Sequence, residues 1–249
     1  MEFKGRFGSK TDIGLVRSSN EDKAISLIDS EGNVLLCVCD GMGGYMKGDF
    51  ASKIAADIIT QGFRSKRRWF FSFQVTRWIS KAIKNINYSV FNESCDSENF
   101  AGMGTTLVLA VFFKDKIFIA NIGDSRLYIL EEDKIEQITR DQTYVEYLAS
   151  RNEINEDQKA TSKDRHYLMN FIGQHKTVDY EYKIIKNPGK TVLLCSDGLY
   201  NNASNKQIFS ALNTNERLDQ KISTLIGIAK ANGGTDNIAV SLWEPYKND

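Results

Sequence analysis

The sequence predicts a fold that mixes helices with a larger number of short strands. Short apolar runs bounded by Gly, Asp or Asn recur along the chain and are typical of strands. Other segments repeat apolar residues every three or four positions, as amphipathic helices do. The 249 residues include only two Pro and no Gly/Ser-rich tract, which argues against a flexible linker. We therefore expect one domain over residues 1–249, large enough to bury a core.

The N-terminal half should contain a hairpin and two long helices. Two strands separated by a turn are expected within residues 3–29. Gly32 followed by Asn33 predicts a hairpin into a buried strand at 34–39, whose sequence VLLCVC ends at Asp40. Ile and Ala at helical spacing predict a helix at about 49–63, and a second helix is expected at about 73–92.

Between these two helices, basic residues are followed by aromatic ones: Arg64, Lys66, Arg67, Arg68, Trp69, Phe70, Phe71 and Phe73. Such a cluster can bind phosphate, nucleic acid or a membrane. In a chain without net charge it more often marks a helix end whose aromatic residues enter the core. We favour that second interpretation.

The C-terminal half begins and ends with strands. The nearly all-apolar run at 105–113 predicts a strand covered on both faces, and further strands are expected at 116–123, 126–130 and 135–138. Residues 139–177 are polar and irregular, with one or two short helices, as in surface segments that cover sites. The remaining elements are strands at 180–185 and 191–195, a helix at 218–229 and a last strand at 238–243.

Composition excludes several classes of function. The 32 basic residues balance 32 acidic ones, so no global positive field attracts nucleic acid or an anionic membrane. No segment has the apolar length of a signal peptide or a membrane span. The four Cys form no C-x-x-C pair, and two His leave little material for a catalytic triad or a zinc site. We expect a cytoplasmic protein that binds neither nucleic acid nor membrane and whose chemistry depends on carboxylates.

An Asp stands beside Gly at four expected strand boundaries: Asp40, Asp124, Asp197 and Asp236. Each alone could be an ordinary turn, but together they predict an acidic cluster at one edge of the sheets. Crowded carboxylates repel one another, and bound divalent cations would remove that repulsion. The Asp40 carboxylate next to the Gly41 carbonyl offers the hard oxygen ligands that suit Mg²⁺ or Mn²⁺.

A second concentration of charge comes earlier in the chain. Glu21 and Asp22 are adjacent, and neighbouring residues of a strand face opposite sides, so only one can point straight into a site. Two cations that share a carboxylate can turn a bridging water into hydroxide that attacks phosphorus. An Arg would have to hold the phosphoryl oxygens, and Arg17 is well placed in sequence for this role.

Seven motifs in a fixed order carry a family resemblance: VRSSNED, DGMGGYMKGDFAS, GTT, GDSR, TRD, SDGL and GGTDN. This set resembles the metal-dependent protein Ser/Thr phosphatases of type 2C (the PPM family), and most of all their compact single-domain bacterial members. The resemblance implies an α+β fold, a four-layer αββα sandwich of two mainly antiparallel sheets flanked by antiparallel helix pairs. It also implies a variable flap at about 139–177, phosphorylated substrates of a Ser/Thr protein kinase, and a monomer.

The resemblance further implies two Mn²⁺ or Mg²⁺ ions per site. Asp40 would bridge them, Gly41 would offer its carbonyl to the second ion, and Arg17 would bind the substrate phosphate. The remaining implied positions are Asp197 and Asp236 on the first ion, Glu21 on the second beside or through water with Asp22 in support, and Asp124 with Asp197 on a third, weaker ion. Thr105 and Thr106 would be structural supports near the strand, and Asn237 would contact the ligands without binding an ion itself.

The chain departs from the family pattern at four positions in this region. Met42 stands where eukaryotic members often have a His, and Tyr45, Asp49 and Gln142 also replace frequent residues. None is an expected metal ligand. Three alternatives stay open: a non-catalytic relative that binds a partner, a phosphatase of a partner-switching regulator, and a β-rich binding domain whose acids are turns. Because every expected acid is present, we favour the Ser/Thr phosphatase.

Overall fold

The computed structural model describes residues 5–43, 47–96, 100–187 and 189–246. The strands within them are β1 (Gly5–Asp12), β2 (Asp22–Ile28), β3 (Val34–Met42), β4 (Gly104–Thr105), β5 (Leu107–Phe113), β6 (Lys116–Ile122), β7 (Arg126–Leu130), β8 (Ile135–Gln137), β9 (Glu181–Lys186), β10 (Val192–Cys195) and β11 (Ile238–Pro245). The helices are α1 (Lys47–Ser65), α2 (Ser72–Asp96), α3 (Tyr144–Ser150), α4 (Glu156–Thr161), α5 (Asp197–Tyr200), α6 (Asn205–Leu212) and α7 (Leu218–Ala231).

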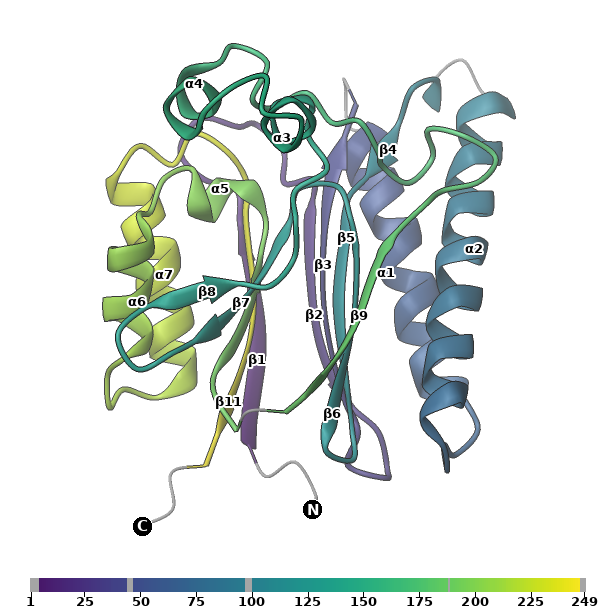
Figure 1. Ribbon diagram of the computed structural model, residues 1–249. Coiled ribbons are helices and arrows are strands. Elements are labelled where there is room, and N and C mark those ends of the chain that lie inside the picture. The colour runs from purple at the N-terminus through teal and green to yellow at the C-terminus, as the bar shows by residue number, and fades with distance from the viewer. Residues whose placement is uncertain (1–4, 44–46, 97–99, 188, 247–249) are drawn as a thin grey trace.

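Two antiparallel sheets lie face to face between layers of helices (Figure 1). One sheet has the order β1-β11-β10-β7-β8, and the other has the order β2-β3-β5-β6-β9, with β4 paired to β3. Helices α1 and α2 cover the second sheet, and α6 and α7 cover the first. This arrangement confirms the expected αββα sandwich. No helix within the described residues is long and apolar enough to cross a membrane.

Alternation along the central strands builds three layers of core. In β5, Leu107, Leu109 and Val111 face α1 and α2, whereas Val108 and Ala110 face the other sheet. Both faces of this strand are buried, as its unbroken apolar sequence predicts. A third core joins the first sheet to α6 and α7.

The same alternation brings polar residues to one end of the space between the sheets. On β3, Val34, Leu36 and Val38 belong to the inter-sheet core, so Asp40 follows them on the same face. β3 continues through Asp40 and Gly41 to Met42, because Asp22 of β2 pairs with Asp40 and β4 pairs with the two residues that follow. The expectation that the strand ends before Asp40 is therefore wrong. The acid stands inside a strand and is held by it.

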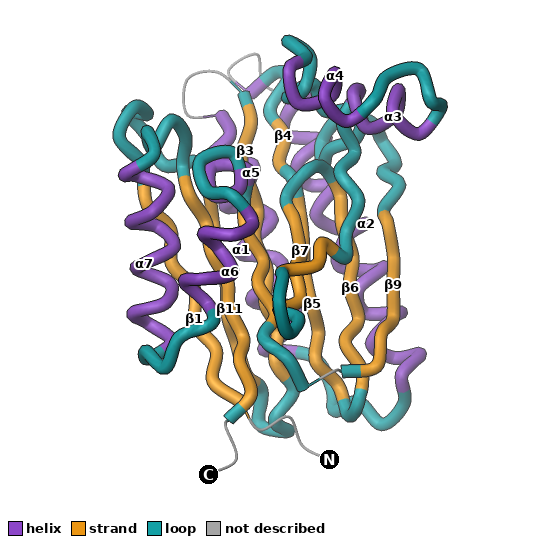
Figure 2. Tube along the Cα trace, turned by 60° about the vertical axis from the view of Figure 1, so that its left-hand side comes forward, coloured by secondary structure: helices purple, strands orange, loops and turns teal. Residues whose placement is uncertain are grey.

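Other differences concern long-range pairing and exposure. β1 and β2 are consecutive in sequence but join different sheets. Helix α6 was not predicted, although Ser204 and Gln207 form a capping box at its start, which is a local sequence signal. Trp69 enters the core as expected, but the phenylalanines that follow it are exposed. The segment that contains α3 and α4 lies across one end of the sandwich (Figures 1 and 2).

Candidate metal centre

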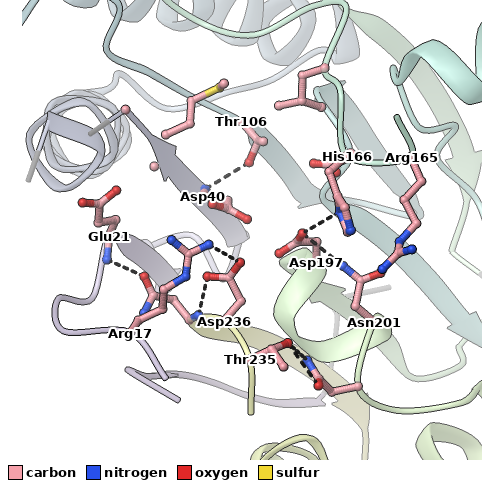
Figure 3. A pocket seen from close by; sticks show the side chains of 17 residues that line it. Arg17, Glu21, Asp40, Thr106, Arg165, His166, Asp197, Asn201, Thr235 and Asp236 are labelled. Carbon is pink, nitrogen blue, oxygen red and sulfur yellow. Dashed lines mark hydrogen bonds and ion pairs between the residues drawn. The ribbon is translucent and has the colours of Figure 1, made fainter. Parts of the chain in front are cut away.

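A polar cleft of about 930 Å³ opens where the two sheets meet the segment that contains α3 and α4. Its walls include seven residues that the sequence nominates for one site: Arg17, Glu21, Asp40, Gly41, Asp124, Asp197 and Asp236 (Figure 3). These residues come from distant parts of the chain. The structure therefore brings the four Asp–Gly boundaries together, as expected from the sequence.

The backbone of Asp40 is held on both sides by Thr105 and Thr106, the two residues that follow Gly104. The amide of Asp40 donates to the Thr106 hydroxyl oxygen at 3.0 Å, and the Thr105 hydroxyl donates to the Asp40 carbonyl at 3.0 Å. Both threonines are buried. The carboxylate consequently projects from a strand whose position does not depend on surface loops.

Gly41 is required by packing. A Cβ at this position would lie 2.1 Å from the carbonyl oxygen of Gly48 and 2.7 Å from that of Glu21. The start of α1 can therefore approach β3 only because both contact residues are glycines. Gly43, by contrast, has a φ of 132°, a conformation that favours glycine.

Asn237 ties the loop that carries Arg17 and Glu21 to the loop that carries Asp236. Its side-chain oxygen accepts from the Glu21 amide at 2.9 Å, and its side-chain nitrogen donates to the carbonyls of Ile13 and Ser19, each at 2.9 Å. The Asn237 amide donates to the Asp236 carboxylate at 2.8 Å. Asn237 therefore holds the loop of Arg17 and Glu21 against the loop of Asp236.

Glu21 and Asp22 point in different directions, as strand alternation requires. Glu21 lines the cleft. Asp22 lies behind it between the sheets, is 2% exposed, and accepts a hydrogen bond of 2.6 Å from the Ser196 hydroxyl. In the register of β2 and β3, Asp22 lies opposite Asp40. Asp22 can reach the cleft only through its neighbours.

Negative charge is concentrated around Asp40. Burial, followed by repulsion from Asp22, Asp197, Asp124 and Asp236, raises the pKa of Asp40 well above its usual value. Burial also raises the pKa of Asp22 to about 7. Burial and repulsion by its acidic neighbours raise the pKa of Asp197 well above its usual value. Such a group of carboxylates is stable in its ionised form only beside compensating positive charge.

Arg17 supplies part of that positive charge. Its guanidinium lies 2.7 Å from the Asp236 carboxylate. This hydrogen bond raises the pKa of Arg17, and Asp197 and Asp40 contribute in the same direction at longer range. Arg17 is therefore a cationic side chain that an acid of the cluster holds in the wall of the cleft (Figure 3).

Asp124 is held by an aromatic ring that rests on an arginine. The Tyr200 hydroxyl donates to the Asp124 carbonyl at 3.1 Å and lies 3.3 Å from its carboxylate. The ring of Tyr200 packs 3.5 Å from the Arg126 guanidinium, which forms a two-point ion pair with Asp141. The GDSR and TRD motifs thus meet to position one acid. Burial raises the pKa of Asp124 to about 6.

Sequence reasoning missed the residues that the polar 139–177 segment adds to the cleft. His166 places its Nδ1 3.8 Å from the Asp197 carboxylate, and Arg165 and Leu168 line the same wall. Burial and the neighbouring Arg165 lower the pKa of His166, so its imidazole is neutral at neutral pH. Asn201, the residue that follows α5, donates to Asp197 at 3.1 Å. No local pattern identifies these residues.

The unusual residues of this region have different placements. Met42 lines the cleft, where its thioether offers no proton to donate. Gln142 accepts from the Gly123 amide at 3.0 Å and donates to the Asn121 carbonyl at 3.2 Å, so it fixes the turn before Asp124. Tyr45 lies outside the described residues.

The donor set fits divalent cations that prefer oxygen ligands. The acids are ionisable, crowded and only partly compensated by Arg17. Within the described residues, however, no three acidic, His or Cys side chains converge closely enough to hold an ion as they stand.

The chain is similar in sequence and in structure to known protein phosphatases. The sequence model of the family described as Protein phosphatase 2C matches residues 16–240. A serine/threonine phosphatase from Listeria innocua is 30% identical over 236 residues, which cover 94% of each chain. The structure of the phosphatase Stp1 from Staphylococcus aureus superimposes with a TM-score of 0.92 at 30% identity, over 99% of this chain and 98% of that one.

A second similar structure contains metal. It is the catalytic domain of the phosphatase PstP in complex with two manganese ions, with a TM-score of 0.83 at 27% identity over 96% of this chain and 97% of that one.

Proposed function

This chain belongs to the protein phosphatase 2C family and is a serine/threonine protein phosphatase, and we propose that it hydrolyses phosphoserine and phosphothreonine with a hydroxide shared by two divalent cations. One observation carries the proposal: buried carboxylates with raised pKa values surround Asp40 in a cleft that also holds Arg17. A cleft with this charge attracts cations, and cations allow it to accept a phosphate ester.

The side chains have distinct roles in this proposal. Asp40 would be shared by the two cations, Asp197 and Asp236 would hold the first, and Glu21 and the Gly41 carbonyl would hold the second. Asp22 supports Asp40 from behind through the register of β2 and β3. The relative that binds two manganese ions supports Mn²⁺ as one suitable ion, and Mg²⁺ offers the same preference for oxygen ligands.

Arg17 binds the phosphate of the substrate. Its guanidinium has a planar fork of donors that can hold two phosphoryl oxygens at once. In the structure the fork is directed at Asp236 and is more than half exposed. When cations neutralise Asp236, Arg17 is free to turn toward the substrate without leaving an uncompensated acid.

The 139–177 segment forms the flap of this enzyme. It contributes Arg165, His166 and Leu168 to the wall of the cleft, so its position affects which phosphoproteins can enter. The substrates would be phosphorylated proteins made by a Ser/Thr protein kinase. Asp124, held by Tyr200 close to Asp197, is suited to a third and weaker ion.

Hydrolysis of a phosphothreonine peptide tests the proposal. The protein is assayed with Mn²⁺, with Mg²⁺ and with EDTA, beside Asp236→Ala and a control variant, Asp57→Ala, which removes an exposed acid of α1. We expect turnover with metal, none with EDTA, none for Asp236→Ala and normal turnover for Asp57→Ala. Absence of turnover with either metal, in protein shown to be folded, would favour a partner-binding relative without catalysis.

A further inference from the structure

Three phenylalanines project from the connection between α1 and α2. The side chains of Phe70, Phe71 and Phe73, here called the aromatic corner, are 56%, 61% and 64% exposed. Trp69, which precedes them, is buried and anchors the connection to the core. Exposed aromatic side chains this close together are unusual on a protein surface and mark an interaction site.

The aromatic corner is rigidly presented. The side-chain oxygen of Gln74 accepts from the amides of Phe70 and Phe71 at 2.7 and 2.9 Å. Lys114, from the turn between β5 and β6, donates to the Phe70 carbonyl at 2.7 Å. The rings of Phe71 and Phe73 stack at 5.8 Å between centroids. These contacts hold the backbone in place while the rings stay in solvent.

Positive charge surrounds the corner. Residues 64–92 contain no Asp or Glu, and their basic residues are Arg64, Lys66, Arg67, Arg68, Arg77, Lys81 and Lys84. Lys66 pairs with Asp29 and Arg68 with Glu31. Among the described residues, the other five have no carboxylate within ion-pair distance, and all five are exposed.

Helix α2 extends this charge away from the corner. Phe73, Arg77, Lys81 and Lys84 recur at spacings of three or four residues and occupy the exposed face of the helix, while Ile79 and Ile83 of the opposite face are buried. The result is a basic stripe with the aromatic rings gathered at one end.

We propose that the aromatic corner and its basic surroundings bind the surface of an anionic phospholipid bilayer. Phenyl rings enter the boundary between headgroups and acyl chains, and Arg and Lys beside them pair with anionic headgroups. The exposed basic side chains without ion-pair partners among the described residues complement the negative charge of the headgroups. A nucleic acid strand would instead need aromatic residues spread along the basic track, so that successive bases could stack.

The location of the corner suits this role. The connection between α1 and α2 lies at the lower end of the molecule in Figure 1, whereas α3, α4 and the cleft lie at the opposite end. A bilayer bound at the corner would leave the cleft open to substrates. The expectation of no membrane contact rested on the charge of the whole chain, which averages over this one-sided distribution.

Co-sedimentation with vesicles tests the proposal. The full chain is mixed at low ionic strength with vesicles of phosphatidylglycerol and phosphatidylcholine, or of phosphatidylcholine alone. The variants are the triple substitution Phe70→Ser, Phe71→Ser and Phe73→Ser, and the double substitution Arg67→Gln and Arg77→Gln. Matched controls are Ile184→Ser, an exposed apolar residue of β9, and Lys206→Gln, an exposed basic residue of α6. Circular dichroism and phosphopeptide hydrolysis verify that each variant is folded.

We expect binding only to vesicles that contain phosphatidylglycerol, and weaker binding at higher salt. The triple variant should bind about tenfold more weakly or worse, because the inserted rings are lost. The double variant should lose about fivefold per charge removed. Both controls should bind as the original protein does. Failure to sediment with the anionic vesicles, unchanged binding by the triple variant, or binding of a single-stranded oligonucleotide without binding of vesicles would overturn the proposal.

Discussion

Replacing Asp124 by Asn should stabilise the protein when no divalent cation is present. Burial raises the pKa of Asp124 from 3.8 to about 6, so ionisation at pH 7.5 works against the folded state. A shift of this size corresponds to about 3 kcal/mol. Asn has nearly the same shape and keeps an oxygen for the Tyr200 hydroxyl, so the substitution removes the charge and little else.

The pH dependence of this gain follows from proton linkage. Between pH 3.8 and 6 the folded protein binds more protons at Asp124 than the unfolded chain does, so stability falls as the pH rises and is level above pH 6. Asn cannot titrate. The advantage of the variant should therefore be about 3 kcal/mol at pH 7.5 and shrink by about 2 kcal/mol at pH 4.5.

Urea unfolding in EDTA measures both values. Asp57→Asn, which neutralises an exposed acid of α1, is the control and should change the free energy of unfolding by less than about 0.5 kcal/mol. Added Mn²⁺ should stabilise the original protein more than the variant, because a ligand that binds only the folded state adds to its stability. A variant no more stable than the original protein at pH 7.5, or an equal gain at pH 4.5, would refute the reasoning.

Other substitutions test packing and substrate binding. Arg17→Ala should raise KM for a phosphopeptide about tenfold or more through loss of charged hydrogen bonds; steady-state kinetics showing equal loss of kcat with unchanged KM would contradict this role. Asn237→Ala should lower the free energy of unfolding by about 1–2 kcal/mol, since it leaves the part-buried carbonyls of Ile13 and Ser19 and the Glu21 amide without this partner, and thermal unfolding measures this. Gly198→Ala should lower stability by more than about 2 kcal/mol because its Cβ would lie 1.9 Å from the Asn237 carbonyl oxygen, whereas Gly227→Ala in α7, where nothing lies within 4 Å, should raise it by about 0.5–1 kcal/mol. Equal melting temperatures for the two glycine variants would contradict the packing assignment.

The secondary structure was largely predictable because its signals are local. Helices α1, α2 and α7 follow from apolar spacing, and β5 (107–113) follows from the apolar part of the run expected as a strand at 105–113. Helix α6 was missed because it is short, and its capping box is a clearer sequence signal than its few apolar positions. The early end assigned to β3 has a different cause, because long-range pairing extends that strand: Asp22 of β2 lies opposite Asp40, and β4 pairs with Gly41 and Met42.

The sequence by itself determined the kind of site. Repeated Asp beside Gly, a shortage of His and seven ordered motifs indicate carboxylate and divalent-metal chemistry, because residue type and order limit which ligands a chain can offer. Those properties need no knowledge of which segments meet.

Only the tertiary structure decided where each of these residues lies and what it contacts. It places Glu21 in the cleft and Asp22 behind it, brings His166 to Asp197, and leaves Phe70 in solvent while Trp69 is buried. Each outcome depends on the approach of segments far apart in sequence, and the energy of burial or repulsion arises only when they meet. A pattern in one segment contains no information about the other segment that will cover it.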